Sequence, residues 1–100
     1  MRLTEEQIQV IKQTARQLFG DEVRVYLFGS RAYDNKKGGD IDLLIKTRDK
    51  SMATLKNKLL FIVNLKMKIG DQKIDVVFDL KGKYSGNFLD SIKKQSVEIC

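Results

Sequence analysis

Acidic side chains at alternating positions are the clearest chemical feature of the sequence. Asp40 and Asp42 are separated by one isoleucine at the start of the segment DIDLLIK. Because side chains of a strand alternate between its two faces, both carboxylates share one face, with Cα atoms about 7 Å apart. Aspartate is depleted from strands, and two like charges so placed repel each other unless something positive lies between them. The spacing therefore favours a bound cation.

A third acidic residue, Asp75, stands on the polar face of a second alternating segment, KIDVVFDL at 73–80. The chain has no histidine and one cysteine, so oxygen atoms are the ligands available for a metal ion. Such ligands suit Mg²⁺, which typically keeps several waters and binds through a few carboxylates and substrate phosphates. We therefore predict that Asp40, Asp42 and Asp75 bind Mg²⁺ and that the substrate is a nucleoside triphosphate.

The pair Gly29 and Ser30 directly follows a predicted strand. A tight Gly-Ser turn lets backbone N–H groups and a hydroxyl approach phosphate oxygens without a Cβ in the way. The next residue, Arg31, either binds a phosphate or anchors the loop by an ion pair with a nearby carboxylate. All three residues are candidates for nucleotide binding.

Helical and strand periodicity predict the elements that position these residues. Helices are expected at about 4–19 and 51–69, strands at 22–28, 40–46 and 73–80, a turn at 34–39, a short helix at 87–95 and an edge strand at 97–99. The first helix begins with a capping-box pattern at Thr4 and Gln7 and ends before Gly20. The Gly-Ser pair would thus follow one strand and the two aspartates would begin its neighbour.

The helix predicted at 51–69 is unusually apolar. Its predicted apolar stripe consists of Met52, Leu55, Leu59, Ile62 and Val63. The run LLFIV at 59–63 has five apolar residues in succession, more than one side of a helix can hold, so some of its side chains must point away from the sheet. Either another chain or the terminal segments of this chain would cover them.

Length and composition restrict the class of protein. One hundred residues fit a single domain, 1–100, and the net charge of +6 favours polyanionic partners such as nucleotides, RNA or an acidic protein. The longest apolar run is far too short for a membrane span, and the lone Cys100 cannot form an internal disulfide. The chain has no signal-peptide pattern, so a cytoplasmic location is expected.

The motif GSRAYDNKKGGDID, followed later by IDV, resembles the DNA polymerase β-like nucleotidyltransferase superfamily. More narrowly, the chain looks like a minimal nucleotidyltransferase of the MNT type. The resemblance implies an α+β fold, a small mixed sheet with helices packed on one face. It also implies that Gly29 and Ser30 hold the triphosphate, that Asp40 and Asp42 bind two Mg²⁺ ions, and that Asp75 binds one ion and helps activate the incoming hydroxyl.

The function that the resemblance implies is transfer of AMP from ATP to a protein hydroxyl. In MNT-type pairs the small transferase is an antitoxin that silences a HEPN-domain ribonuclease encoded by a neighbouring gene. Two alternatives remain: transfer to a small molecule or an RNA end, and a catalytically inactive subunit that acts by binding alone. Direct nucleic-acid binding is not expected to be the primary role.

Overall fold

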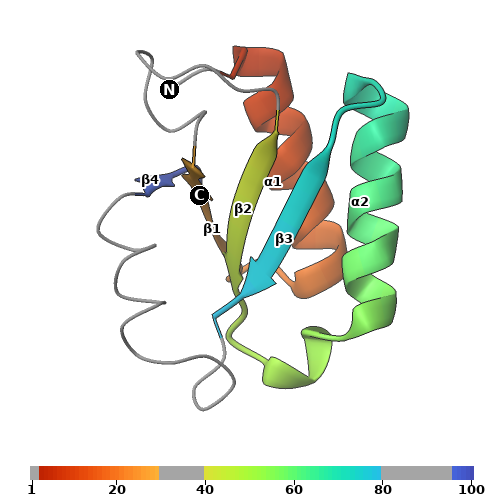
Figure 1. Cartoon of the computed structure of the whole chain (residues 1–100). Helices are drawn as coiled ribbons and strands as arrows, with labels where there is room; N and C mark the ends of the chain where they lie inside the picture. Colours follow the sequence, from red (N-terminus) through yellow and green to blue (C-terminus); the bar gives the residue numbers. More distant parts are fainter. Residues whose placement is uncertain (1–2, 30–39, 80–95) are drawn as a thin grey trace.

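The computed structural model of the chain describes residues 3–29, 40–79 and 96–100, which form a sheet with helices beside it (Figure 1). In chain order the elements are α1 (Glu5–Phe19), β1 (Arg24–Phe28), β2 (Ile41–Lys46), the 3-10 helix η2 (Lys50–Met52), α2 (Leu55–Ile69), β3 (Ile74–Phe78) and β4 (Val97–Glu98). The turn predicted at 34–39 and the short helix predicted at 87–95 lie outside the described residues.

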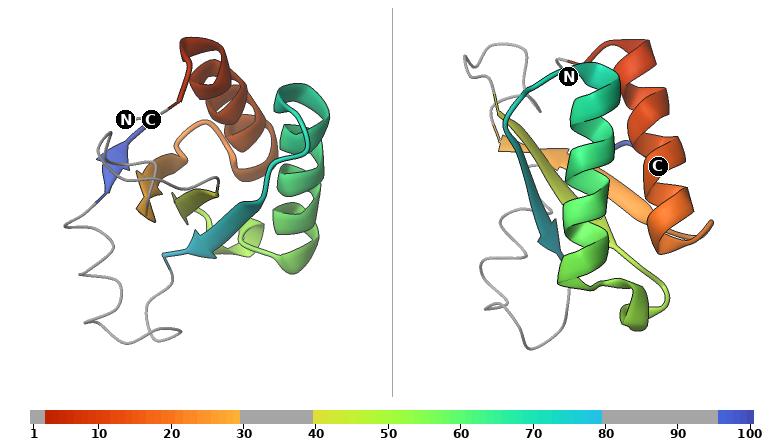
Figure 2. Two further views of the ribbon diagram at one scale, coloured as in Figure 1. Left: turned by 45° about the horizontal axis from the view of Figure 1, so that its top comes forward. Right: turned by 90° about the vertical axis from the view of Figure 1, so that its right-hand side faces the viewer.

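The sheet is mixed and has the strand order β3-β2-β1-β4. Strand β1 pairs antiparallel with β2 and with β4, whereas β2 and β3 are parallel. A parallel pair needs a long crossover connection, and η2 and α2 supply it here. Both α-helices lie on the same side of the sheet, as the right-hand view of Figure 2 shows. The predicted α+β fold, with a small mixed sheet and helices on one face, is confirmed.

Helix α1 begins and ends as the sequence predicts. The side chain of Thr4 accepts a hydrogen bond from the backbone N–H of Gln7, and the Gln7 side chain accepts one from the backbone N–H of Thr4. This capping box satisfies two N–H groups that have no partner within the helix. At the other end Gly20 adopts φ +99°. Its backbone N–H donates a hydrogen bond to the carbonyl oxygen of Arg16 and so caps the helix.

The core fills the space between the helices and the sheet. Alternating residues of the strands point into it, and three aromatic rings join the layers. The Phe19 ring lies edge-on to the rings of Phe61 and Phe78, with centroid distances of 5.5 and 5.6 Å. The buried apolar residues of this core are Ile11, Ala15, Phe19, Val23, Val25, Leu27, Ile41, Leu43, Ile45, Phe61, Leu65, Ile74, Val76, Phe78 and Ile99. Leu44 is also fully buried, but in a second cluster with Tyr26, Phe28 and Val77.

The predicted apolar stripe of the second long helix is wrong in part. Met52 belongs to the separate helix η2, and α2 begins only after Thr54, whose side chain accepts from the N–H of Asn57. Within α2 the buried residues are Phe61 and Leu65, and Ile62 packs partly against the core; three residues of the predicted stripe, Leu55, Leu59 and Val63, are exposed. The helix is apolar on more than one side, so periodicity alone does not select the side that meets Phe19.

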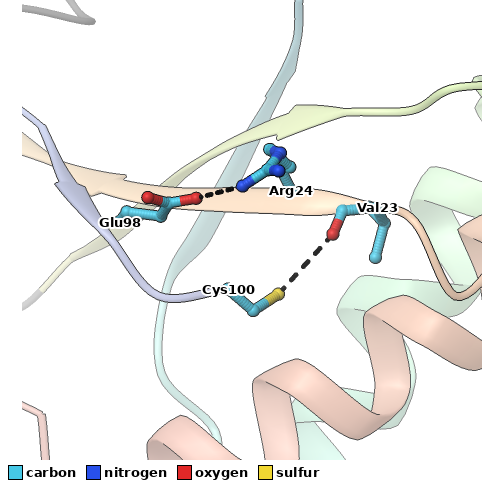
Figure 3. Close-up of polar contacts among 4 residues, drawn as sticks. All are labelled: Val23, Arg24, Glu98 and Cys100. Carbon is cyan, nitrogen blue, oxygen red and sulfur yellow. Dashed lines mark hydrogen bonds and ion pairs between the residues drawn. The ribbon is translucent and has the colours of Figure 1, made fainter.

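Strand β4 is the edge strand predicted at 97–99. Its register with β1 pairs Glu98 with Tyr26, and Arg24 donates a hydrogen bond of 2.8 Å to the Glu98 carboxylate (Figure 3). Just beyond the strand, the Cys100 thiol lies 3.8 Å from the carbonyl oxygen of Val23. Burial raises the pKa of this thiol. The segment 96–100 therefore completes the β1 side of the sheet.

No helix in the described parts of the chain combines the length and the apolar character that crossing a lipid bilayer requires.

Candidate active site

The predicted site residues that the structure describes, Gly29, Asp40, Asp42 and Asp75, lie where β1 ends and β2 and β3 begin. In the register of the sheet, Phe28 lies beside Asp42, and Asp42 lies beside Asp75. Gly29 follows β1 directly, and Asp40 directly precedes β2. Three strands therefore bring these four residues to one end of the sheet. The upper ends of β2 and β3 in Figure 1 mark this place.

Asp42 and Asp75 are neighbours across the parallel β2–β3 pair. Adjacent strands are about 4.8 Å apart, so the two carboxylates are within reach of one another. Their chain neighbours Ile41, Leu43 and Ile74 are buried in the core. Because side chains alternate along a strand, both aspartates lie on the face of the sheet that does not pack against the helices. Asp42 is half-buried there, and Asp75 is exposed.

The electrostatics of the pair are unfavourable for two negative charges. Burial raises the pKa of the Asp42 carboxyl, and the charge of Asp75 together with a hydrogen bond to it raises this pKa further. The negative charge of Asp40 also raises the pKa of Asp42, whereas the Lys73 ammonium opposes this rise. A bound cation would favour the charged form of Asp42, as a positive charge within a few ångströms does. Carboxylate oxygens are also the donors that Mg²⁺ prefers, so the residues fit this ion.

The structure places Asp40 differently from the other two aspartates. Its carboxylate lies 3.7 Å from the Nζ of Lys73, and both side chains are well exposed. Among the residues that the structure describes, no group of three or more Asp, Glu, His or Cys side chains is arranged closely enough to hold a metal ion. The pair Asp42 and Asp75 is therefore brought together, while binding of an ion by all three aspartates stays a prediction.

Lys73 is a residue of the site that the sequence reasoning missed. Its ammonium lies 3.7 Å from the Asp40 carboxylate and opposes the rise in the pKa of Asp42. It precedes Asp75 by two positions, as Asp40 precedes Asp42, and β2 and β3 are parallel and in register. The repeated spacing was the available signal, but only the register shows that Lys73 lies across from Asp40.

The Asp42 carboxylate occupies the space that a side chain at position 29 would need. It adopts φ +76°, and a Cβ built on it would lie 2.3 Å from Oδ2 of Asp42. No side chain fits at that distance, so the residue must be glycine for Asp42 to keep its position. The sequence predicts that Gly29 holds phosphate, and the structure adds this second reason for a glycine. Ser30 and Arg31, the other predicted nucleotide-binding residues, lie outside the described residues.

Replacing Gly29 by alanine is expected to reduce catalysis through Asp42. The new Cβ would displace the carboxylate, and the left-handed backbone would cost about 1–2 kcal/mol of stability. Gly70→Ala is a matched control, because Gly70 has φ +102° but nothing within 4 Å of a built Cβ. Both variants should unfold at lower temperature in calorimetry. Only Gly29→Ala should lose activity, by about tenfold or more; an equal loss in both would show that backbone strain alone is responsible.

A separate cleft of about 620 Å³ opens at the opposite end of the sheet. Basic side chains border it, among them Arg24 and Arg48, which pair with Glu98 and Glu22. None of the predicted site residues that the structure describes lines this cleft. The chemistry is therefore assigned to the aspartate end of the sheet.

Comparison with known proteins gives one family. The family model described as Polymerase beta, Nucleotidyltransferase matches residues 6–100. None of the curated proteins matches this sequence.

Proposed function

Since the chain belongs to the polymerase beta nucleotidyltransferase family, and is by that membership a nucleotidyltransferase, we propose that it transfers AMP from ATP to a hydroxyl group of a partner protein. The partner in this proposal is a HEPN-domain ribonuclease encoded by a neighbouring gene, which the transfer silences. The proposed setting is the cytoplasm, where ATP is available. The observation that carries the site of transfer is the in-register pair Asp42 and Asp75 beside Gly29.

In the proposed reaction the acceptor oxygen attacks the α-phosphorus of ATP. The new P–O bond forms as the bond to the bridging oxygen of the β-phosphate breaks, so pyrophosphate leaves. Two Mg²⁺ ions, when bound, would supply charge neutralisation for the attacking and leaving oxygens. Asp42 and Asp75 would hold them, and Asp40 is the further predicted ligand.

The chain's own residues have separate tasks in this proposal. The exposed carboxylate of Asp75 accepts the proton of the incoming hydroxyl, because it faces solvent and the acceptor can reach it. The half-buried Asp42 fixes the geometry, and Gly29 lets the backbone approach both Asp42 and the triphosphate. The Lys73 ammonium balances part of the negative charge while the site is empty.

Two features support a protein as the acceptor. The Asp75 side chain is exposed, so a bulky acceptor can approach its carboxylate. The resemblance to minimal nucleotidyltransferases supports a helical HEPN protein as that acceptor. A small molecule or an RNA end is the alternative acceptor, and an inactive binding subunit is the alternative role.

Two radiolabelled forms of ATP test the proposal. We expect label from [α-³²P]ATP to appear on the partner protein in the presence of Mg²⁺, and label from [γ-³²P]ATP to leave in pyrophosphate. Phosphoryl transfer would give the reverse result, and chelation of Mg²⁺ should stop the reaction. A tight complex without label would favour the inactive binding subunit. Label on a small hydroxyl compound or on RNA, with none on the partner, would favour the alternative acceptors.

A further inference from the structure

The side of α2 that points away from the core is apolar. Five large side chains lie on it, and their exposed fractions run from 41% for Leu60 to 79% for Met67. We call this surface the outer face of α2; it consists of Leu55, Leu59, Leu60, Val63 and Met67. These are all the exposed large apolar side chains found among the described residues. In the right-hand view of Figure 2, α2 stands in front of the sheet.

The outer face is a continuous ridge. Leu55, Leu59, Val63 and Met67 follow one another at intervals of four residues, so they form a row that runs about 20 Å along the helix. The buried residues Phe61 and Leu65 lie on the opposite side. Single exposed apolar residues are ordinary, but a row of them marks a contact surface. Rows of this kind interdigitate with those of a second helix.

The charge of α2 restricts what can pack on this ridge. The helix LKNKLLFIVNLKMKI contains four lysines and no acidic residue. At 100° per residue, Lys56 and Lys66 lie on the same side of the helix as the ridge. Lys66 has one weak contact, 3.9 Å to the Asp71 carboxylate, which is almost fully exposed. The ridge therefore favours a partner that carries carboxylates beside its own apolar residues.

A second copy of this chain fits less well. In a two-fold symmetric pair the same surface faces itself. If two copies of α2 packed antiparallel about the middle of the ridge, Lys56 of each would lie near Lys66 of the other. Like charges so placed repel, and nothing on the ridge compensates for them. A membrane surface also fits less well, because the ridge lacks the tryptophan and phenylalanine typical of interfacial helices.

We propose that the outer face of α2 is the docking surface for an amphipathic helix of another protein, whose apolar ridge is flanked by glutamate or aspartate. Such a helix would lie along α2 and pair its carboxylates with Lys56 and Lys66. Because α2 lies on the side of the sheet opposite to Asp42 and Asp75, the docked helix leaves those carboxylates accessible. The inference stands on the exposed ridge and its charge, and holds independently of the acceptor of nucleotide transfer.

Nuclear magnetic resonance detects such docking even when it is weak. The probe is a synthetic helical peptide with leucine at intervals of four residues and glutamate on both flanks; the matched peptide has lysine in place of each glutamate. The full chain, labelled with ¹⁵N and with ¹³C in its methyl groups, is titrated with each peptide to millimolar concentration. We expect the acidic peptide alone to shift the signals of Leu59, Val63 and Met67.

Substitutions on the exposed ridge separate its apolar and charged parts. Leu59→Gln with Val63→Gln should abolish the shifts, since both side chains are exposed and their replacement leaves the core intact. Lys56→Glu should weaken binding about threefold, the size of one exposed ion pair. Lys46→Glu makes the same change of charge at the last residue of β2, whose side chain alternates with buried Ile45 and so lies on the face of the sheet away from α2; it should leave the affinity within about 1.5-fold.

Four results would overturn the proposal. One is the absence of shifts with either peptide at millimolar concentration. Another is equal binding of the acidic and basic peptides. Dimerisation of the unliganded chain that Leu59→Gln with Val63→Gln abolishes would assign the ridge to a second copy. Binding to anionic phosphatidylserine vesicles that this double substitution abolishes, without peptide binding, would assign it to a membrane.

Discussion

Asp42→Asn is expected to lower the rate of nucleotide transfer by about a thousandfold or more while making the free protein slightly more stable. The loss of rate follows because the amide removes one negative charge from the place where the proposal puts the metal ions. The gain in stability follows from the raised pKa of the Asp42 carboxyl. A carboxyl with a raised pKa in the folded state is destabilising when ionised. The loss of folding stability caused by ionised Asp42 is absent at pH values below the unfolded-state pKa and fully present at pH values above the folded-state pKa.

The stability change is therefore expected at neutral pH and not in acid. The unfolded chain titrates near the ordinary value of 3.8, and the two proteins should unfold alike below that pH. Asp42 is only partly buried, so solvent screening limits the gain to about 1 kcal/mol or less. Added Mg²⁺ should stabilise the parent more than the variant, because the ion relieves repulsion only where Asp42 is charged.

The measurements are the labelled-ATP assay and scanning calorimetry at several pH values. Asp21→Asn is the matched control, since it makes the same change of charge at an exposed position after α1, at the opposite end of the sheet from Asp42. Its activity should stay within about twofold of the parent, because its charge is screened from the site. An Asp42→Asn variant that transfers nucleotide as fast as the parent would contradict the assignment of Asp42 to the site.

Phe61→Ala is expected to destabilise the fold by about 3–5 kcal/mol, the cost of removing a buried aromatic ring. Phe61 has no exposed surface, and its ring packs edge-on against Phe19 between the two helices. Small domains are typically stable by only about 5–15 kcal/mol, so this loss is a large share of the total. Urea denaturation followed by circular dichroism measures it directly.

Leu59→Ala is the matched comparison on the same helix. Leu59 is about half exposed, so its truncation should cost about 0.5 kcal/mol or less. The residue lies two positions before Phe61, and both changes replace an apolar side chain by alanine in the middle of α2. If the two variants lost equal stability, or if Leu59→Ala lost more, the assignment of the buried side of α2 would be reversed.

The predictability of the fold differs between its helices for a physical reason. Helix α1 has one apolar side and clear end signals at Thr4 and Gly20, so its sequence fixes both its length and its buried face. Helix α2 carries apolar residues on opposite sides, including Leu59 and Phe61. Which side faces the sheet depends on packing against Phe19, a residue 42 positions away from Phe61, and no local pattern contains that information. The excess of apolar side chains was predictable, but their location was not.

In the candidate site, too, one part could be predicted from the sequence and another part could not. Alternation along each strand was enough to predict that Asp42 and Asp75 lie on polar faces. Their contact also required β2 and β3 to be adjacent, parallel and in register, which the sequence does not specify. For the same reason the pairing of Asp40 with Lys73 was missed. The close approach of Gly29 to Asp42 depends on a backbone conformation that no residue pattern reveals.

The pairing of β4 with β1 has a consequence for the order in which the molecule is made. Tyr26 and Leu27 find their β4 partners, Glu98 and Val97, some 70 residues later in the chain. A ribosome must therefore synthesise almost the whole domain before the outer edge of β1 gains its neighbour. Until then the nascent polypeptide presents an open edge of hydrogen-bonding groups, which other chains can join.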